Sequence, residues 1–84
     1  MTKYAKCLVR EVENWDWGYF KEQAEISDSG VHIGWLDDLM PVCGKQKPTG
    51  KDIDLFLGII DSAAHEYKLS LEVAEHEEIW LKLE

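Results

Sequence analysis

The segment Gly50–Tyr67 has the clearest periodicity in the chain and constrains the fold more than any other stretch. Its apolar residues recur at steps of three and four, which places them on one side of an α-helix: Ile53, Phe56, Ile60, Ala63, Ala64 and Tyr67. Thr49, with Asp52 three residues later, is a typical helix start. Gly58 lies inside this helix, where glycine costs about 1 kcal/mol relative to alanine. We therefore expect one amphipathic helix that a strand of the sheet approaches closely at Gly58.

The residues after this helix alternate with a period of two, which is typical of half-buried strands. Segments 69–74 and 79–84 both follow this pattern and predict an antiparallel hairpin that turns around His76–Glu78. In the second strand, the alternation places Trp80 on the face opposite Ile79 and its apolar neighbours.

The first part of the chain fits more than one pattern. Residues 4–13 fit a helical stripe that continues to Trp15, but they also fit an extended strand with both faces partly covered. We favour the strand, because the segments that follow look like a meander that needs a further pairing partner. Residues 14–18 contain Asn14 and Gly18 and predict a turn.

Residues 19–27 and 31–36 predict a second hairpin, joined by the turn residues Asp28–Gly30. In the second of these strands, Trp35 is expected on the core face, together with the apolar residues two and four positions before it. Residues 37–50 contain two prolines and no regular period, and they predict a connecting loop.

The predicted order is therefore β-β-β-α-β-β. This is an α+β fold in two layers, an antiparallel sheet of about five strands with one helix packed on one face. Eighty-four residues suit a single domain, 1–84. So short a chain has little room for a deep catalytic pocket beside its core, which weighs against an enzyme.

The charge of the chain is strongly negative and unevenly distributed. The net charge of −8 argues against nucleic acid or an anionic membrane as a direct partner. Residues 52–84 hold nine acids and two bases, whereas residues 1–51 hold eight acids and seven bases. The excess lies on the central helix and the segments after it, and it suits a basic protein partner.

The two cysteines predict a reducing compartment. Cys7 and Cys43 form neither a disulfide framework nor a C-x-x-C pair. No basic start precedes an apolar run, and no apolar stretch approaches the roughly 20 residues that span a bilayer. We expect a cytoplasmic protein with reduced thiols, and a Cys7–Cys43 disulfide is the less favoured alternative.

No residue spacing in the chain predicts a metal, cofactor or catalytic site. The possible soft or borderline ligands lack the close spacing of a zinc site: Cys7, His32, Cys43, His65 and His76. The Lys-rich loop at 44–51 lacks the spacing that cradles phosphates. An enzyme that uses the thiol of Cys7 or Cys43 is the least favoured hypothesis.

Aromatic side chains beside carboxylates are the candidates for a binding surface, because tryptophan is enriched at the energetic centres of interfaces. The predicted partner-binding residues are Trp15, Asp16, Trp17, Glu72, Glu75, Glu77, Glu78 and Trp80. The alternative is that these rings close the ends of a small core and that the carboxylates only solvate the surface.

These features predict a small acidic, non-enzymatic protein-binding module. The expected partner is a basic protein, either a nucleic-acid-binding protein or a nuclease, whose basic surface the carboxylates occlude. Phage anti-defence proteins of the anti-CRISPR or anti-restriction type, and immunity proteins against nuclease toxins, share this size and charge. The alternative is a homo-oligomeric structural or regulatory protein, for example a homodimer, in which the last strand pairs edge to edge and buries Trp80.

Overall fold

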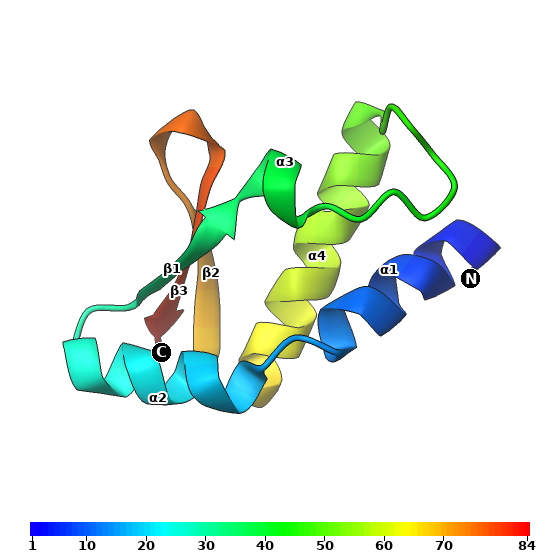
Figure 1. Cartoon of the computed structure of the whole chain (residues 1–84). Coiled ribbons are helices and arrows are strands. Elements are labelled where there is room, and N and C mark those ends of the chain that lie inside the picture. Colours follow the sequence, from blue (N-terminus) through cyan, green and yellow to red (C-terminus); the bar gives the residue numbers. More distant parts are fainter.

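The chain folds into four helices and a three-stranded antiparallel sheet (Figure 1). The computed structural model describes all residues, 1–84. Its elements are α1 (Lys3–Glu13), α2 (Trp17–Ser27), β1 (Val31–Trp35), α3 (Leu36–Leu39), α4 (Gly50–Glu66), β2 (Leu69–Val73), a 3-10 turn (Glu75–Glu77) and β3 (Glu78–Leu83). The predicted α+β class is confirmed, but the predicted five strands and single helix are wrong.

The last strand, β3, lies in the middle of the sheet, whose order is β1-β3-β2. It pairs antiparallel with both neighbours. The predicted C-terminal hairpin is confirmed, because β2 and β3 pair from Leu69–Leu83 to Val73–Ile79. Gly30, just before β1, allows a close approach to β3, since a Cβ at this position would lie 2.8 Å from the backbone oxygen of Leu81.

A β-bulge changes the direction of the side chains along β1. The register with β3 shifts between His32 and Gly34, so one extra residue is inserted there. Trp35 consequently pairs with Glu78 and remains 46% exposed. The expectation that Trp35 faces the core is wrong, because a single inserted residue moves the following side chain to the other face of the sheet.

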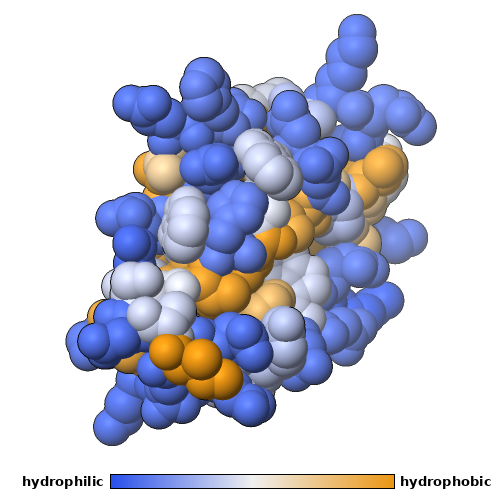
Figure 2. All heavy atoms as spheres, turned by 60° about the vertical axis from the view of Figure 1, so that its left-hand side comes forward, coloured by the Kyte–Doolittle hydropathy of each residue, from blue (hydrophilic) through white to orange (hydrophobic).

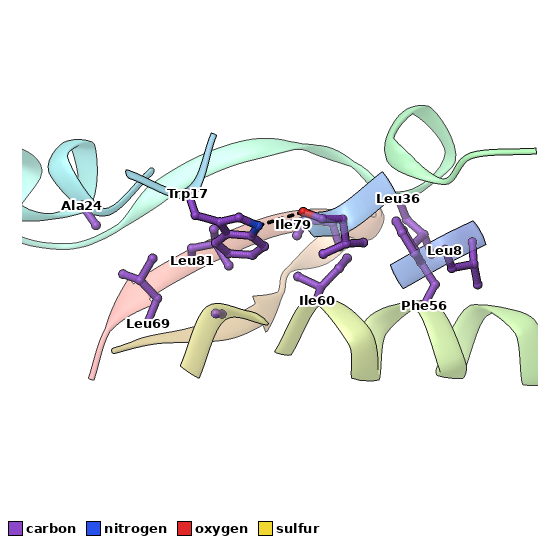
Figure 3. Close-up of a cluster of buried hydrophobic side chains, with 11 residues drawn as sticks. Leu8, Trp17, Ala24, Leu36, Phe56, Ile60, Leu69, Ile79 and Leu81 are labelled. Atoms are coloured by element: carbon purple, nitrogen blue, oxygen red, sulfur yellow. Dashed lines mark hydrogen bonds between the residues drawn. The ribbon is translucent and has the colours of Figure 1, made fainter. Parts of the chain in front are cut away.

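The helix predicted over 50–67 is confirmed as α4, and it begins with a capping box. The hydroxyl of Thr49 accepts from the backbone N–H of Asp52 at 3.2 Å, and the Asp52 carboxylate accepts from the Thr49 N–H at 2.8 Å. Phe56, Ile60 and Ala64 have no exposed surface. Together with residues from every other helix and from β2 and β3, they form the core (Figure 3).

The expectation of a strand close to Gly58 is wrong. Gly58 is exposed, and a Cβ built at this position would meet nothing within 4 Å. No packing contact within the folded chain therefore requires a glycine in the middle of α4.

Residues 4–13 are helical, so the predicted strand is wrong and the helical alternative is right. Thr2 caps the helix, because its hydroxyl accepts from the Ala5 N–H at 3.0 Å. Ala5, Leu8 and Val12 are buried at steps of three and four and face the core. Burial of this single stripe against α4 favours the helix, since a strand would expose Leu8 and Val12 on the opposite face.

The predicted hairpin of 19–27 with 31–36 is also wrong, because residues 17–27 form α2. The Asp16 carboxylate caps this helix by accepting from the Tyr19 N–H at 3.1 Å, so the predicted turn is shorter than 14–18. Trp17 and Ala24 are buried on one side of α2. Ile26, which a strand would have placed on the same face as Ala24, is 70% exposed.

The side chain of Trp17 joins α1 to α2 at the centre of the core. Its indole N–H donates to the backbone oxygen of Val12 at 2.8 Å, at the end of α1 (Figure 3). Its ring is 4% exposed and stacks on Tyr67 at a centroid distance of 5.9 Å. A buried indole with a satisfied N–H fixes the angle between the two helices.

Cys7 and Cys43 form a disulfide, so the expectation of two reduced thiols is wrong. The bond joins the middle of α1 to the loop between α3 and α4, two segments 36 residues apart in the sequence. No free cysteine remains. The hypothesis of a thiol enzyme therefore lacks its nucleophile in this structure.

Replacing Cys7 and Cys43 together by serine is expected to lower the free energy of unfolding by about 3–4 kcal/mol, because the bond constrains the unfolded chain over a loop of this length. Urea unfolding of the oxidised protein and of the double variant measures the difference. A reductant should destabilise the wild type alone, and equal midpoints for the oxidised wild type and the variant would contradict the prediction.

Candidate partner-binding face

One face of the sheet carries a row of large, partly or fully exposed side chains from all three strands. The register places His32 of β1 and Glu72 of β2 on either side of Trp80, the central residue of β3. On the opposite face, Ile79 and Leu81 are completely buried. We call this surface, made of His32, Trp35, Glu72, Glu78, Trp80 and Lys82, the open sheet face.

Three aromatic rings lie side by side on the open sheet face. The ring of His32 lies between two indoles, at centroid distances of 4.8 Å from Trp35 and 5.1 Å from Trp80. The Nε2 atom of His32 is buried without a hydrogen-bond partner, and the nearest carboxylate oxygen, of Glu78, lies 4.0 Å away. A buried polar atom without a hydrogen-bond partner lowers the stability of the fold, so the position of His32 between the two indoles is not the most stable packing for this face.

Charged side chains border the aromatic row. The Lys82 ammonium lies 5.2 Å from the centroid of the Trp80 ring and 3.5 Å from a carboxylate oxygen of Glu72. This ion pair is solvent-exposed and contributes little to stability. Among the residues of the open sheet face, Lys82 is the only lysine or arginine, whereas Glu72 and Glu78 are both carboxylates.

The turn between β2 and β3 adds the carboxylates of Glu75 and Glu77, and its backbone is strained. The N–H of Glu78 donates to the carbonyl of Glu75, and the two residues between them, His76 and Glu77, have φ values of 60° and 61°. Tight hairpin turns with positive φ at both central residues strongly prefer Asn-Gly. A residue other than glycine with positive φ costs of order 1–3 kcal/mol, so this hairpin tip is strained.

The structure brings together five of the eight predicted binding residues and separates the other three from them. Glu72, Glu75, Glu77, Glu78 and Trp80 lie on the open sheet face or at its hairpin tip.

Trp15, Asp16 and Trp17 belong instead to the junction of α1 and α2. Trp15 is half-buried and packs edge-to-face with Phe56, with centroids 6.0 Å apart. Asp16 is exposed and acts as the cap of α2. Trp17 lies in the core, so its ring is not accessible to a partner of the folded chain.

Two members of the open sheet face, His32 and Trp35, were not predicted as binding residues. His32 and Trp35 are three residues apart, so strict alternation would place them on opposite faces of the strand, but the bulge brings them to the same face. Gly34 was the available signal, since an isolated glycine inside a strand pattern suggests a bulge.

The central position of β3 excludes one form of the homo-oligomer that was the alternative hypothesis. A homo-oligomer in which the last strand pairs edge to edge is not possible in this fold, because β1 and β2 already occupy both edges of β3. The edge strands of the sheet are β1 and β2.

A second cluster of polar groups lies at the start of α4. The Lys45 ammonium donates to both oxygens of the Asp52 carboxylate at 3.0 and 3.1 Å, and it lies 4.5 Å from the centroid of the Tyr4 ring. Hydrogen bonds from the Thr49 N–H and from Lys45 lower the pKa of the Asp52 carboxyl. Burial, with a smaller effect of Asp52, raises the pKa of the Tyr4 phenol. These contacts fix the loop before α4 and form no reactive pair.

No three His, Cys, Asp or Glu side chains converge as the ligands of a metal ion would. None of the helices combines the length and the apolar character needed to cross a bilayer. Hydrophilic side chains cover much of the face in Figure 2, with a diagonal band of hydrophobic ones between them. Searches against protein-family models, curated proteins and solved structures found no match.

The Asp52→Asn variant is expected to lose stability at neutral pH but not in acid. The folded-state pKa of Asp52 lies below that of the unfolded chain, about 3.9, so the carboxylate stabilises the fold above that value. This contribution disappears as the pH falls through the folded-state pKa. Thermal unfolding from pH 7 to pH 2 should show the two melting curves converging at low pH.

Asp54→Asn is the matched control for this measurement, because Asp54 is exposed on the same helix and makes no side-chain hydrogen bond. A constant difference in Tm between Asp52→Asn and the wild type across the whole pH range would contradict the prediction.

Proposed function

We propose that this chain is a small acidic, non-enzymatic protein-binding module that uses the open sheet face and the hairpin tip to bind a basic protein. The observation that carries the proposal is the row of Trp35, His32 and Trp80 on the open sheet face, bordered by Glu72 and Glu78. Tryptophans supply much of the binding energy where they lie at the centre of an interface, and charges at the rim set orientation and association rate.

The partner we propose is a nucleic-acid-handling protein, such as a nuclease, whose basic surface is occluded in a one-to-one complex. Carboxylates at the hairpin tip would take the positions that phosphates occupy in the partner's normal ligand. Support comes from the net charge of −8 and from the position of Glu75 and Glu77 at an exposed tip. The comparison with anti-defence and immunity proteins rests on size and charge alone.

The strain at the hairpin tip supports this assignment. An Asn-Gly pair at positions 76 and 77 would relieve the positive-φ cost and remove one carboxylate. Strained, charged residues at an exposed turn are common at binding sites, where the surroundings hold them in place. The chain therefore has a charged residue, Glu77, at a position where an uncharged glycine would stabilise the fold.

We expect the Trp80→Ala variant to weaken partner binding about 30-fold, which corresponds to the roughly 2 kcal/mol of an interface centre. The partner is first captured from an extract of the native host cell at low salt and identified. Binding is then measured with purified components, together with the partner's ability to bind a DNA duplex. Wild-type protein should block the duplex at a one-to-one ratio, and binding should weaken strongly at high salt.

Matched controls separate the surface from general effects. Tyr19→Ala is the control for Trp80→Ala, because it removes an aromatic ring that is 52% exposed on α2. Glu22→Lys with Glu25→Lys on α2 is the control for Glu72→Lys with Glu78→Lys on the open sheet face, because both pairs make the same change of charge. The α2 variants should bind nearly as the wild type does. Full binding by Trp80→Ala, or a captured partner without a basic surface, would refute the proposal.

We also propose a cytoplasmic location, where proteins that handle nucleic acid are found. Thiols are usually held reduced in that compartment, so the Cys7–Cys43 disulfide is the observation that argues against this location, and the thiol state in the cell tests it. Alkylation with a maleimide polymer before lysis measures the thiol state directly. A chain that is fully protected from alkylation in intact cells would place it in an oxidising compartment instead.

A further inference from the structure

The helix α4 has a second apolar stripe that the rest of the chain covers only in part. A groove of about 560 Å³ runs between α1 and α4, and its apolar lining comes from Met1, Val9, Val12, Leu55, Ile59 and Ala63. Leu55, Ile59 and Ala63 follow one another at steps of four on α4, beside the stripe that faces the core. Leu55 is 39% exposed, and Val9 and Ile59 are only half-buried.

The groove is long enough to bind a short helix. Its lining on α4 extends from Asp54 to Glu66, which at 1.5 Å per residue is about 18 Å, or just over three helical turns. Two adjacent helices with an apolar groove between them accept the apolar face of a third helix, as in other helix-in-groove complexes.

Gly58 lines this groove, where its missing side chain leaves room for a close approach. Nothing within the folded chain requires glycine there, because a Cβ would meet nothing within 4 Å. A glycine that weakens its own helix without an internal reason is explained if the backbone of a bound segment packs against it.

The charges around the groove determine the kind of occupant. The charged side chains that line it are the carboxylates of Glu13, Asp54 and Glu66, and the N-terminal ammonium of Met1 is a positive group among the lining residues. All three carboxylates are exposed. A second copy of the chain would bring the same carboxylates together and add to the repulsion between two molecules of net charge −8. Lysine and arginine side chains of another protein would instead pair with them.

We infer that this groove docks a basic amphipathic α-helix of a partner protein, about three turns long. The apolar face of that helix packs on Leu55 and Ile59, its backbone approaches Gly58, and its basic residues lie against Glu13, Asp54 and Glu66. The inference does not depend on the open sheet face, which comes from other elements of the fold.

The test uses a synthetic amidated peptide of about 14 residues, with leucines at helical spacing and lysines on both sides of that stripe. A scrambled peptide of the same composition is the control. We expect the amphipathic peptide to bind at least tenfold more tightly than the scrambled one at low salt. Its amide chemical-shift changes should lie on α1 and α4, and Trp80→Ala should leave its affinity within about twofold.

Variants of the groove make the outcome decisive. Gly58→Leu and the pair Asp54→Lys with Glu66→Lys should each weaken the amphipathic peptide at least tenfold, whereas Glu25→Lys on α2 should change its affinity about twofold or less. Gly58→Ala should weaken binding while raising the Tm by about 4–8 °C, so loss of binding cannot be attributed to unfolding.

Three results would overturn the inference. The first is equal or absent binding of the two peptides, and the second is binding that Gly58→Leu leaves unchanged. The third is sedimentation showing a wild-type dimer that Gly58→Leu converts to a monomer, because the groove would then hold a second copy of the chain.

Discussion

Burial of one face of α4 is the interaction on which the rest of this structure depends. Phe56, Ile60 and Ala64 are fully enclosed, and α1, α2, α3 and the strands β2 and β3 all contribute residues to the same cluster. A 17-residue helix is only marginally stable in water, and three short strands need a covering layer on one face. Neither layer is therefore stable alone, and the two layers should fold and unfold together.

Residues whose local pattern agrees with their burial were predictable from the sequence. The capping box of Thr49 and Asp52 marked the start of α4, and the alternation in 69–74 and 79–84 defined β2 and β3. Residues 4–13 and 19–27 were misassigned because short apolar runs fit both periods, and only contact with α4 and β3 selects the helix. The open sheet face was partly predictable, since Trp80 and its carboxylates follow the alternation, whereas Trp35 depends on a bulge.

The connection between α3 and α4 shows what spacing along the chain does not reveal. Cys43 bonds to Cys7 on α1, and Lys45 bonds to Asp52 in the first turn of α4. These two contacts tie a loop with two prolines to both helices that form the groove. The disulfide joins residues far apart in the sequence, and the Lys45–Asp52 contact depends on the path of the loop, so composition and periodicity do not predict either of them. The disulfide offsets part of the instability expected of so small a core.

Several features that weaken this fold lie at its two candidate surfaces, although Asp28, Cys43 and Lys68 also have positive φ and lie outside both. His76 and Glu77 are strained at the hairpin tip, Trp35 is exposed on the open sheet face, and Gly58 interrupts a strong helix beside the groove. The core, by contrast, has a satisfied indole at Trp17 and side chains with no exposed area. Violations of local preference in an otherwise consistent sequence are expected at functional positions. One of the two surfaces is aromatic and polar and the other is aliphatic, so under the two proposals a partner would be held by two separate segments. Two linked contacts of moderate strength can together give high affinity, because binding at the first raises the local concentration of the second.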